Sequence, residues 1–151
     1  MKGLLASATI AAALALAGPA AANWRVVWDG MAVGEARSGK ASLSAECLGD
    51  GLVLGVYEKA WPFEHAAGID IVIDGHAYPV RQYGSGDRIV LSDADGKGGT
   101  LGTSPTLRAA LKAGREARLV GASVSGIAPK EITFGLLGSE KAISTVEAFC
   151  R

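Results

Sequence analysis

The sequence predicts an α+β domain that is mainly β: an antiparallel β-sandwich or open barrel with two short helices, the last at the C-terminus. Several short runs alternate apolar with polar side chains, as half-buried strands do. Glycine-containing turns separate runs that follow one another closely, so neighbouring strands should pair as hairpins. Two further segments carry apolar residues at helical spacing.

Residues 1–22 have the pattern of a bacterial Sec-type signal peptide. Lys2 supplies the positive start, residues 4–16 form an apolar run, and Pro19-Ala20-Ala21-Ala22 is a small-residue cleavage site. A membrane anchor is the alternative, but the run is shorter than the roughly 20 residues that span a bilayer. We expect cleavage before Asn23 and one exported domain, residues 23–151, periplasmic or secreted and without a membrane span.

Charge and cysteine content narrow the function further. The chain has 15 Lys and Arg against 15 Asp and Glu, which gives no electrostatic case for nucleic-acid binding. Its two cysteines, Cys47 and Cys150, are expected to pair after export, although two reduced buried thiols are the alternative. A disulfide closing a loop of roughly 100 residues stabilises by about 4–5 kcal/mol in the chain-entropy model.

The first half of the domain reads as three strands. Residues 23–29 form the first, with Trp24, Val26 and Trp28 on its inner face. The glycine-punctuated stretch 30–40 is expected to be a loop. Residues 41–47 alternate and turn Cys47 inward, and a tight turn at 49–51 leads to the returning strand 52–59.

The second half adds five strands and two helices. Strand 69–73 turns at Asp74-Gly75 into strand 76–83, followed by strand 87–92 and a loop at 93–102. Thr103-Ser104-Pro105 is a helix start, residues 106–113 the helix, and Gly114 its stop. Strands 116–124 and 131–137 flank a turn at 126–129.

The C-terminal helix follows Gly138, and Ser139 is the expected N-cap. Its core-facing stripe is predicted to contain Ala142, Ile143, Val146, Phe149 and Cys150. Cys150 would therefore be tied to Cys47 from the end of this stripe.

The segment Trp61-Pro62-Phe63-Glu64-His65 is the one stretch with binding character. Two aromatic residues around a proline, next to Glu64 and His65, could form an exposed anchor of the kind interfaces use. The alternative is that Trp61 and Phe63 close one end of the core. The choice decides whether Trp61, Phe63, Glu64 and His65 bind a partner.

No catalytic, cofactor or metal site emerges from the sequence. Asp93 and Asp95 resemble a fragment of a calcium loop, but position 102, where a bidentate glutamate belongs, is Gly102. No histidine has a second histidine or a cysteine at ligand spacing. No G-x-S-x-G nucleophile motif occurs. We therefore expect a protein that is not an enzyme and needs no cofactor.

Four stretches resemble a known family: WRVV at 24–27, IVIDG at 71–75, LRAALKAG at 107–114 and FGLLGSEKAI at 134–143. Together they are similar to the small periplasmic proteins of the invasion-associated locus B type found in alphaproteobacteria. The resemblance implies an exported β-rich domain linked to host-cell interaction, and it supplies no catalytic residues.

These observations favour a non-enzymatic binding domain that recognises a protein or a component of the cell envelope. A narrower version is an inhibitor of an envelope-attacking hydrolase. A carrier of small molecules or lipids is the second class, because small inner-face residues could leave an apolar cavity. A hydrolase is the third.

Overall fold

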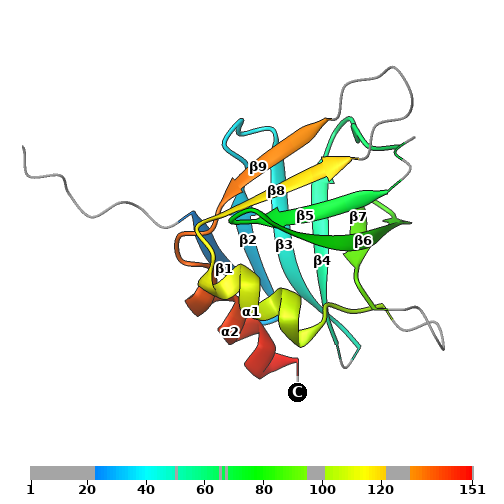
Figure 1. The fold of residues 1–151 in the computed structure, drawn as a ribbon. Coiled ribbons are helices and arrows are strands. Elements are labelled where there is room, and N and C mark those ends of the chain that lie inside the picture. Colours follow the sequence, from blue (N-terminus) through cyan, green and yellow to red (C-terminus); the bar gives the residue numbers. More distant parts are fainter. Residues whose placement is uncertain are drawn as a thin grey trace, which may run out of the picture.

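The computed structural model describes residues 23–49, 51–64, 66, 68–94, 101–121 and 130–150 (Figure 1). The predicted signal peptide, His65, Asp95 and the turn at 126–129 lie outside these residues. The elements are β1 (Trp24–Trp28), β2 (Met31–Glu35), β3 (Ala41–Leu48), β4 (Gly51–Glu58), β5 (Ile69–Ile73), β6 (His76–Ser85), β7 (Arg88–Ser92), α1 (Pro105–Ala113), β8 (Glu116–Gly121), β9 (Glu131–Gly135) and α2 (Ser139–Phe149).

The strands form one nine-stranded sheet in the order β1-β2-β3-β4-β7-β6-β5-β8-β9, and every neighbouring pair is antiparallel. The sheet curls until its β9 end reaches the residues after β2 (Figure 1). There Ala36 bridges to Phe134, and the Arg37 N–H donates to the Thr133 carbonyl at 2.9 Å. The predicted class, mainly β with two helices and the last at the C-terminus, is confirmed.

Strand alternation places the apolar side chains inside the curl. Ile69, Ile71 and Ile73 of β5 are buried, and their partners on β8 include the buried Ala117 and Leu119. Leu43, Leu54 and Leu91 reach the same cluster from the opposite wall. The two walls therefore share one continuous core.

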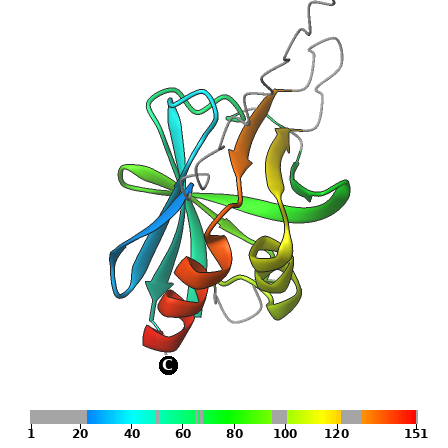
Figure 2. The same cartoon turned by 90° about the vertical axis from the view of Figure 1, so that its left-hand side faces the viewer.

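The two helices lie together at one end of the curled sheet, below its two halves in Figure 2. Leu107 and Leu111 of α1 are buried, as are Ala142, Ile143 and Val146 of α2. The predicted start of α1 is confirmed, because Ser104 accepts a hydrogen bond from the Leu107 N–H at 3.1 Å. No helix among the described residues is long and apolar enough to cross a membrane.

One prediction about the first half of the chain is wrong: residues 31–35 are not loop but strand β2. Gly34 accounts for the error, because it acts as a packing residue rather than a turn residue. A Cβ at this position would lie 2.4 Å from the Trp24 indole. The missing side chain lets the indole lie against the strand, and its N–H donates to the Gly135 carbonyl at 3.1 Å.

The predicted cap of α2 is also wrong. The N-cap is Gly138, in a left-handed conformation with φ 88°, and no side chain caps the helix. Ser139 is instead fully buried, and its hydroxyl donates to the Leu111 carbonyl of α1 at 2.7 Å. The serine thus ties the two helices together, because tertiary packing offers it a buried carbonyl at that position.

Candidate functional site

The segment at 61–64 lies at the end of the sheet opposite the helices. Phe63 is only 1% exposed, and a Cβ on Gly121, the last residue of β8, would lie 2.5 Å from its ring. Trp61 is half-buried and packs on the core. The two rings meet edge to face, with centroids 5.0 Å apart and an interplanar angle of 79°. Phe63 is therefore a core residue and is not accessible to a partner.

Polar contacts hold this aromatic pair in place. The Trp61 indole N–H donates to Gln82 Oε1 at 2.6 Å, and Gln82 Nε2 donates to the Phe63 carbonyl at 3.1 Å. Glu64 is exposed beside them. Because the indole N–H and one ring face are occupied internally, the geometry accords with the alternative that Trp61 and Phe63 close the core.

A different region gathers the exposed apolar side chains. Among the described residues, six large hydrophobic side chains are 40% to 52% exposed. Three of them are consecutive on β1, and two flank the ends of α2. The six are Val26, Val27, Trp28, Leu48, Leu137 and Phe149. We call this set the β1–α2 surface.

Backbone contacts bring these segments together. The Leu137 carbonyl, just before α2, accepts hydrogen bonds from the Asn23 and Trp24 N–H groups at 2.9 and 3.2 Å. At the other end of β1, the Cys47 N–H donates to the Gly30 carbonyl at 2.9 Å. The start of α2 is thus fixed beside the start of β1, the first strand of the sheet, and the end of β3 is fixed beside the residues after β1.

Trp28 and Phe149 form the centre of the β1–α2 surface. Their rings meet edge to face at 5.9 Å, with an interplanar angle of 90°. Gly30 lies under both, because a Cβ there would be 2.1 Å from the Trp28 ring and 3.0 Å from the Phe149 ring. Within the described part of the chain, the Trp28 indole N–H has no hydrogen-bond partner, unlike those of Trp24 and Trp61. The ring is positioned, and no described residue accepts a hydrogen bond from its N–H.

The sequence placed these side chains inside, and that prediction is wrong for Val26, Trp28 and Phe149. The register between β1 and β2 shifts between Val26 and Trp28, which breaks the alternation that the sequence suggested. Since β1 is also an edge strand, no further strand covers its side chains on that side. Phe149 packs on the half-exposed Trp28 ring and over Gly30, and it stays 52% exposed.

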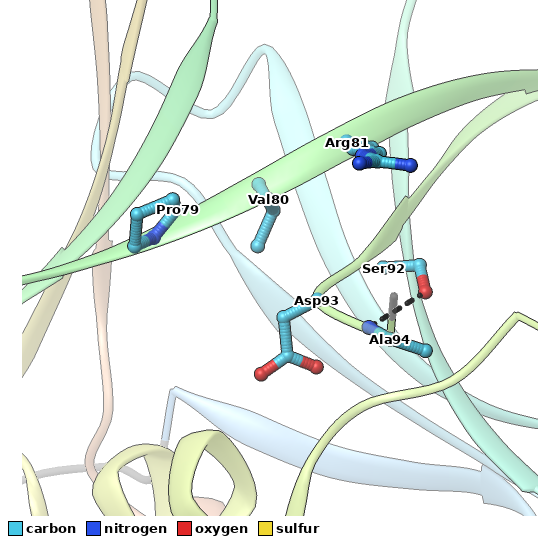
Figure 3. Close-up of a pocket in the computed structure, with 6 residues that line it drawn as sticks. All are labelled: Pro79, Val80, Arg81, Ser92, Asp93 and Ala94. Atoms are coloured by element: carbon cyan, nitrogen blue, oxygen red, sulfur yellow. Dashed lines mark hydrogen bonds between the residues drawn. The ribbon is translucent and has the colours of Figure 1, made fainter. Parts of the chain in front are cut away.

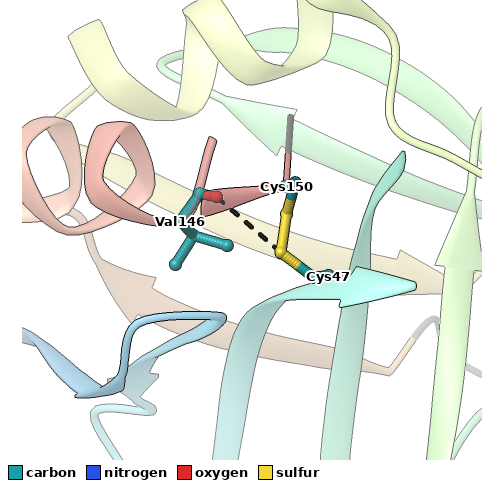
Figure 4. Close-up of a disulfide and its surroundings, with 3 residues drawn as sticks. All are labelled: Cys47, Val146 and Cys150. Atoms are coloured by element: carbon teal, nitrogen blue, oxygen red, sulfur yellow. Dashed lines mark hydrogen bonds between the residues drawn. A yellow bond between two sulfur atoms is a disulfide. The ribbon is translucent and has the colours of Figure 1, made fainter. Parts of the chain in front are cut away.

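The predicted disulfide is confirmed: Cys47 of β3 is bonded to Cys150, directly after α2 (Figure 4). The Cys47 sulfur lies 3.8 Å from the Val146 carbonyl oxygen. This is a close contact rather than a hydrogen bond, because a disulfide sulfur carries no proton. The bond fixes the last turn of α2 next to Trp28 and Gly30.

A buried polar cluster occupies the outer face of β3, β4 and β7. Ser44 and Tyr57 donate hydrogen bonds to Glu46 Oε1, the latter at 2.9 Å, and Arg88 Nε lies 3.0 Å from Glu46 Oε2. Burial, followed by the hydrogen bond to Glu46 and its negative charge, raises the pKa of Tyr57 to about 12. Both carboxylate oxygens of Glu46 are bonded within the cluster, so we assign it a structural role.

Asp93 also has a structural role. Its carboxylate accepts hydrogen bonds from the Ser104 N–H, at 2.6 Å, and from the Ser104 hydroxyl, so it braces the start of α1. Asp93 and Arg81 border a pocket of about 170 Å³ between β6 and β7 (Figure 3). Among the described residues, no three acidic, histidine or cysteine side chains form a group that could hold a metal.

The pocket of Figure 3 is smaller than the roughly 300–1,000 Å³ of typical ligand pockets. Its size therefore does not support the carrier alternative.

No known protein family, curated protein or solved structure matches the chain.

Proposed function

We propose that this chain is a non-enzymatic, exported binding domain that recognises another protein through the β1–α2 surface. The observation that carries the proposal is the half-exposed Trp28–Phe149 ring pair, which joins the end of β1, where Val26 and Val27 are also exposed, to the end of α2. Soluble proteins rarely keep such residues together unless the patch binds something. Tryptophan is also the side chain most enriched among residues that dominate binding energy.

The geometry of the surface suits a preformed contact. Trp28 is held by Phe149 and Gly30, so little side-chain entropy is lost when a partner docks on it. A partner that supplies an apolar pocket for the ring and a carbonyl for the indole N–H would satisfy both parts of the side chain. Such a pocket is typical of a folded protein.

A lipid surface is the weaker occupant. Membrane-surface binding normally combines an apolar face with a basic one. Among the described residues of β1 and the turn after it, the charged side chains are Arg25, which is paired with Glu35 at 3.2 Å, and Asp29. The chain as a whole carries no net charge.

The proposal includes export: residues 1–22 act as a Sec-type signal peptide that directs the domain to the periplasm or to secretion. The disulfide supports this location, since disulfides persist in oxidising compartments. The resemblance to the invasion-associated locus B type suggests that the partner is met during host interaction.

Photo-crosslinking in the native host tests the proposal. p-Benzoylphenylalanine replaces Val27, on the surface, or Ala77, an exposed residue of β6 five positions away in the sheet. We expect a discrete protein adduct from position 27 and none from position 77. Equal adducts from both positions, or binding of position-27 protein to anionic lipid vesicles instead, would contradict a protein-specific surface.

The crosslinked protein, once purified, allows a direct measurement of affinity. Trp28→Ala should weaken binding at least about 30-fold, corresponding to the roughly 2 kcal/mol or more of a dominant contact residue. Arg81→Ala, on the exposed face of β6, is the control and should leave the dissociation constant unchanged. Unaltered affinity of the Trp28 variant in isothermal titration would refute the proposed surface.

A further inference from the structure

We infer that the Cys47–Cys150 disulfide is a redox lock on the β1–α2 surface: it holds Phe149 against Trp28, and its reduction releases Phe149 while the domain stays folded. The inference concerns regulation and rests on the proposed function only for its consequence, a loss of partner affinity. The positions of the rings themselves are independent of any partner.

The disulfide is connected to both halves of the aromatic pair. On one side Cys150 directly follows Phe149 in the chain. On the other, the Cys47 N–H donates to the carbonyl of Gly30, the residue on which the Trp28 ring lies. One covalent bond, drawn in Figure 4, thus links β3, which is hydrogen-bonded to Gly30, to the residue that follows Phe149.

The rest of α2 is anchored independently of the disulfide. Ile143 and Val146 are fully buried, and Ser139 is hydrogen-bonded to Leu111 of α1. Glu147 pairs with Arg108 at 2.9 Å and with Lys112 at 2.7 Å. These contacts secure the helix as far as residue 147.

Beyond Glu147 the described contacts are fewer. The Cys150 N–H donates to the Val146 carbonyl at 2.9 Å, a bond of the helix itself; Cys150 also packs on the core through the disulfide, and Phe149 touches the exposed Trp28 ring over Gly30. Helix ends fray when no tertiary contact holds them. The disulfide is therefore the restraint that keeps the final turn beside Trp28.

The chemistry of release is a thiol–disulfide exchange with a dithiol reductant. Its thiolate attacks one sulfur of the Cys47–Cys150 bond, and its second thiol then resolves the mixed disulfide. The protein gains two electrons and two protons as two thiols, and the reductant becomes a disulfide. Both cysteines are partly exposed, so the bond is within reach of such a reagent.

Fluorine NMR of protein labelled with 5-fluorotryptophan measures the effect directly. The chain has three tryptophans, and Trp28→Phe assigns the resonance of interest. The reference is Phe149→Ala with the disulfide intact, which shows the chemical shift of Trp28 without its neighbour. On addition of dithiothreitol we expect the Trp28 resonance to move to that reference position, while the Trp24 and Trp61 resonances stay unchanged.

The alternative outcomes separate cleanly. A Trp28 resonance that does not move on reduction overturns the lock. Collapse of all three resonances to the unfolded position overturns it too, because the bond would then hold the whole fold. The Cys47→Ser, Cys150→Ser double variant should reproduce the reduced spectrum without reductant.

With the crosslinked partner in hand, reduction should lower affinity by the same factor as Phe149→Ala, about tenfold for a lost aromatic contact. If the Trp28 resonance does not move on reduction, the redox lock is refuted but the proposed function is not. Failure of Trp28→Ala to weaken binding removes the proposed function and leaves the lock.

Discussion

The molecule contains two tryptophan–phenylalanine pairs that meet edge to face, one at each end of the curled sheet. Trp61 and Phe63 are two residues apart in the chain, with ring centroids 5.0 Å apart. Trp28 and Phe149 lie at opposite ends of the domain's sequence, with centroids 5.9 Å apart. In the first pair Phe63 is buried and the indole N–H is bonded to Gln82. In the second, both rings are half-exposed.

The difference shows that aromatic clustering in sequence is a poor guide to which rings stay exposed. The sequence offers Trp61 and Phe63 as a candidate binding anchor, but Phe63 is buried and closes one end of the core. The pair with the features of a contact site is assembled by the β1 edge, α2 and the disulfide. Substitutions that remove or displace each pair in turn test this contrast.

The largest expected effect is on the buried pair. Phe63→Ala should lower the free energy of unfolding by about 3–5 kcal/mol, because it leaves a cavity where a fully buried ring was. Chemical denaturation followed by far-UV circular dichroism gives the value. Phe149→Ala is the matched control. It should lower the free energy of unfolding by less than about 1 kcal/mol, because about half of the Phe149 side chain is already exposed to water. Equal losses would abolish the contrast between the pairs.

A subtler test uses the glycine beneath each pair. Gly121→Ala would place a Cβ 2.5 Å from the Phe63 ring, which has no room to move, so we expect a loss of about 1–3 kcal/mol in stability. Gly30→Ala would displace the Trp28 and Phe149 rings, which can shift toward solvent because each is half-exposed. Gly30→Ala should therefore lower stability less than Gly121→Ala does, and it should weaken partner binding more. Thermal unfolding and titration of both variants decide between these outcomes.

The smallest effect concerns the cluster assigned a structural role. The pKa of Tyr57 is raised from 10.0 to about 12, so the fold favours the neutral phenol. Its contribution to stability is complete below pH 10 and is lost as the pH rises through about 12. Absorbance titration of the phenolate should show one tyrosine ionising near pH 12.

Tyr57→Phe should abolish that late ionisation and cost about 1 kcal/mol at neutral pH, the typical net value of one hydrogen bond. Partner affinity should not change. A Tyr57→Phe variant that loses binding would indicate that the cluster, and not the β1–α2 surface alone, takes part in recognition.

Local patterns predicted most of the secondary structure. The structure confirms the strand predicted from Ile69, Ile71 and Ile73 and its turn at Asp74-Gly75. Hairpins of this kind can be predicted because their pairing depends on residues that are neighbours in the sequence. Strand β2 was missed because Gly34 serves Trp24, a residue of another strand. The cap of α2 was misassigned because Ser139 bonds to a different helix. Each error involves a partner that is distant or on another element.

By itself, the sequence determined the mainly β class, the position of both helices and the pairing of Cys47 with Cys150, since periodicity, turn residues and a count of two cysteines suffice for these. Only the tertiary structure decided which aromatic residues face water. Exposure depends on what packs against a side chain. For Trp28 it is decided by the register shift in β1 and by the position of β1 at the edge of the sheet. It also depends on the end of α2, more than one hundred residues later in the chain, which the Cys47–Cys150 disulfide (sequence separation 103) holds in place.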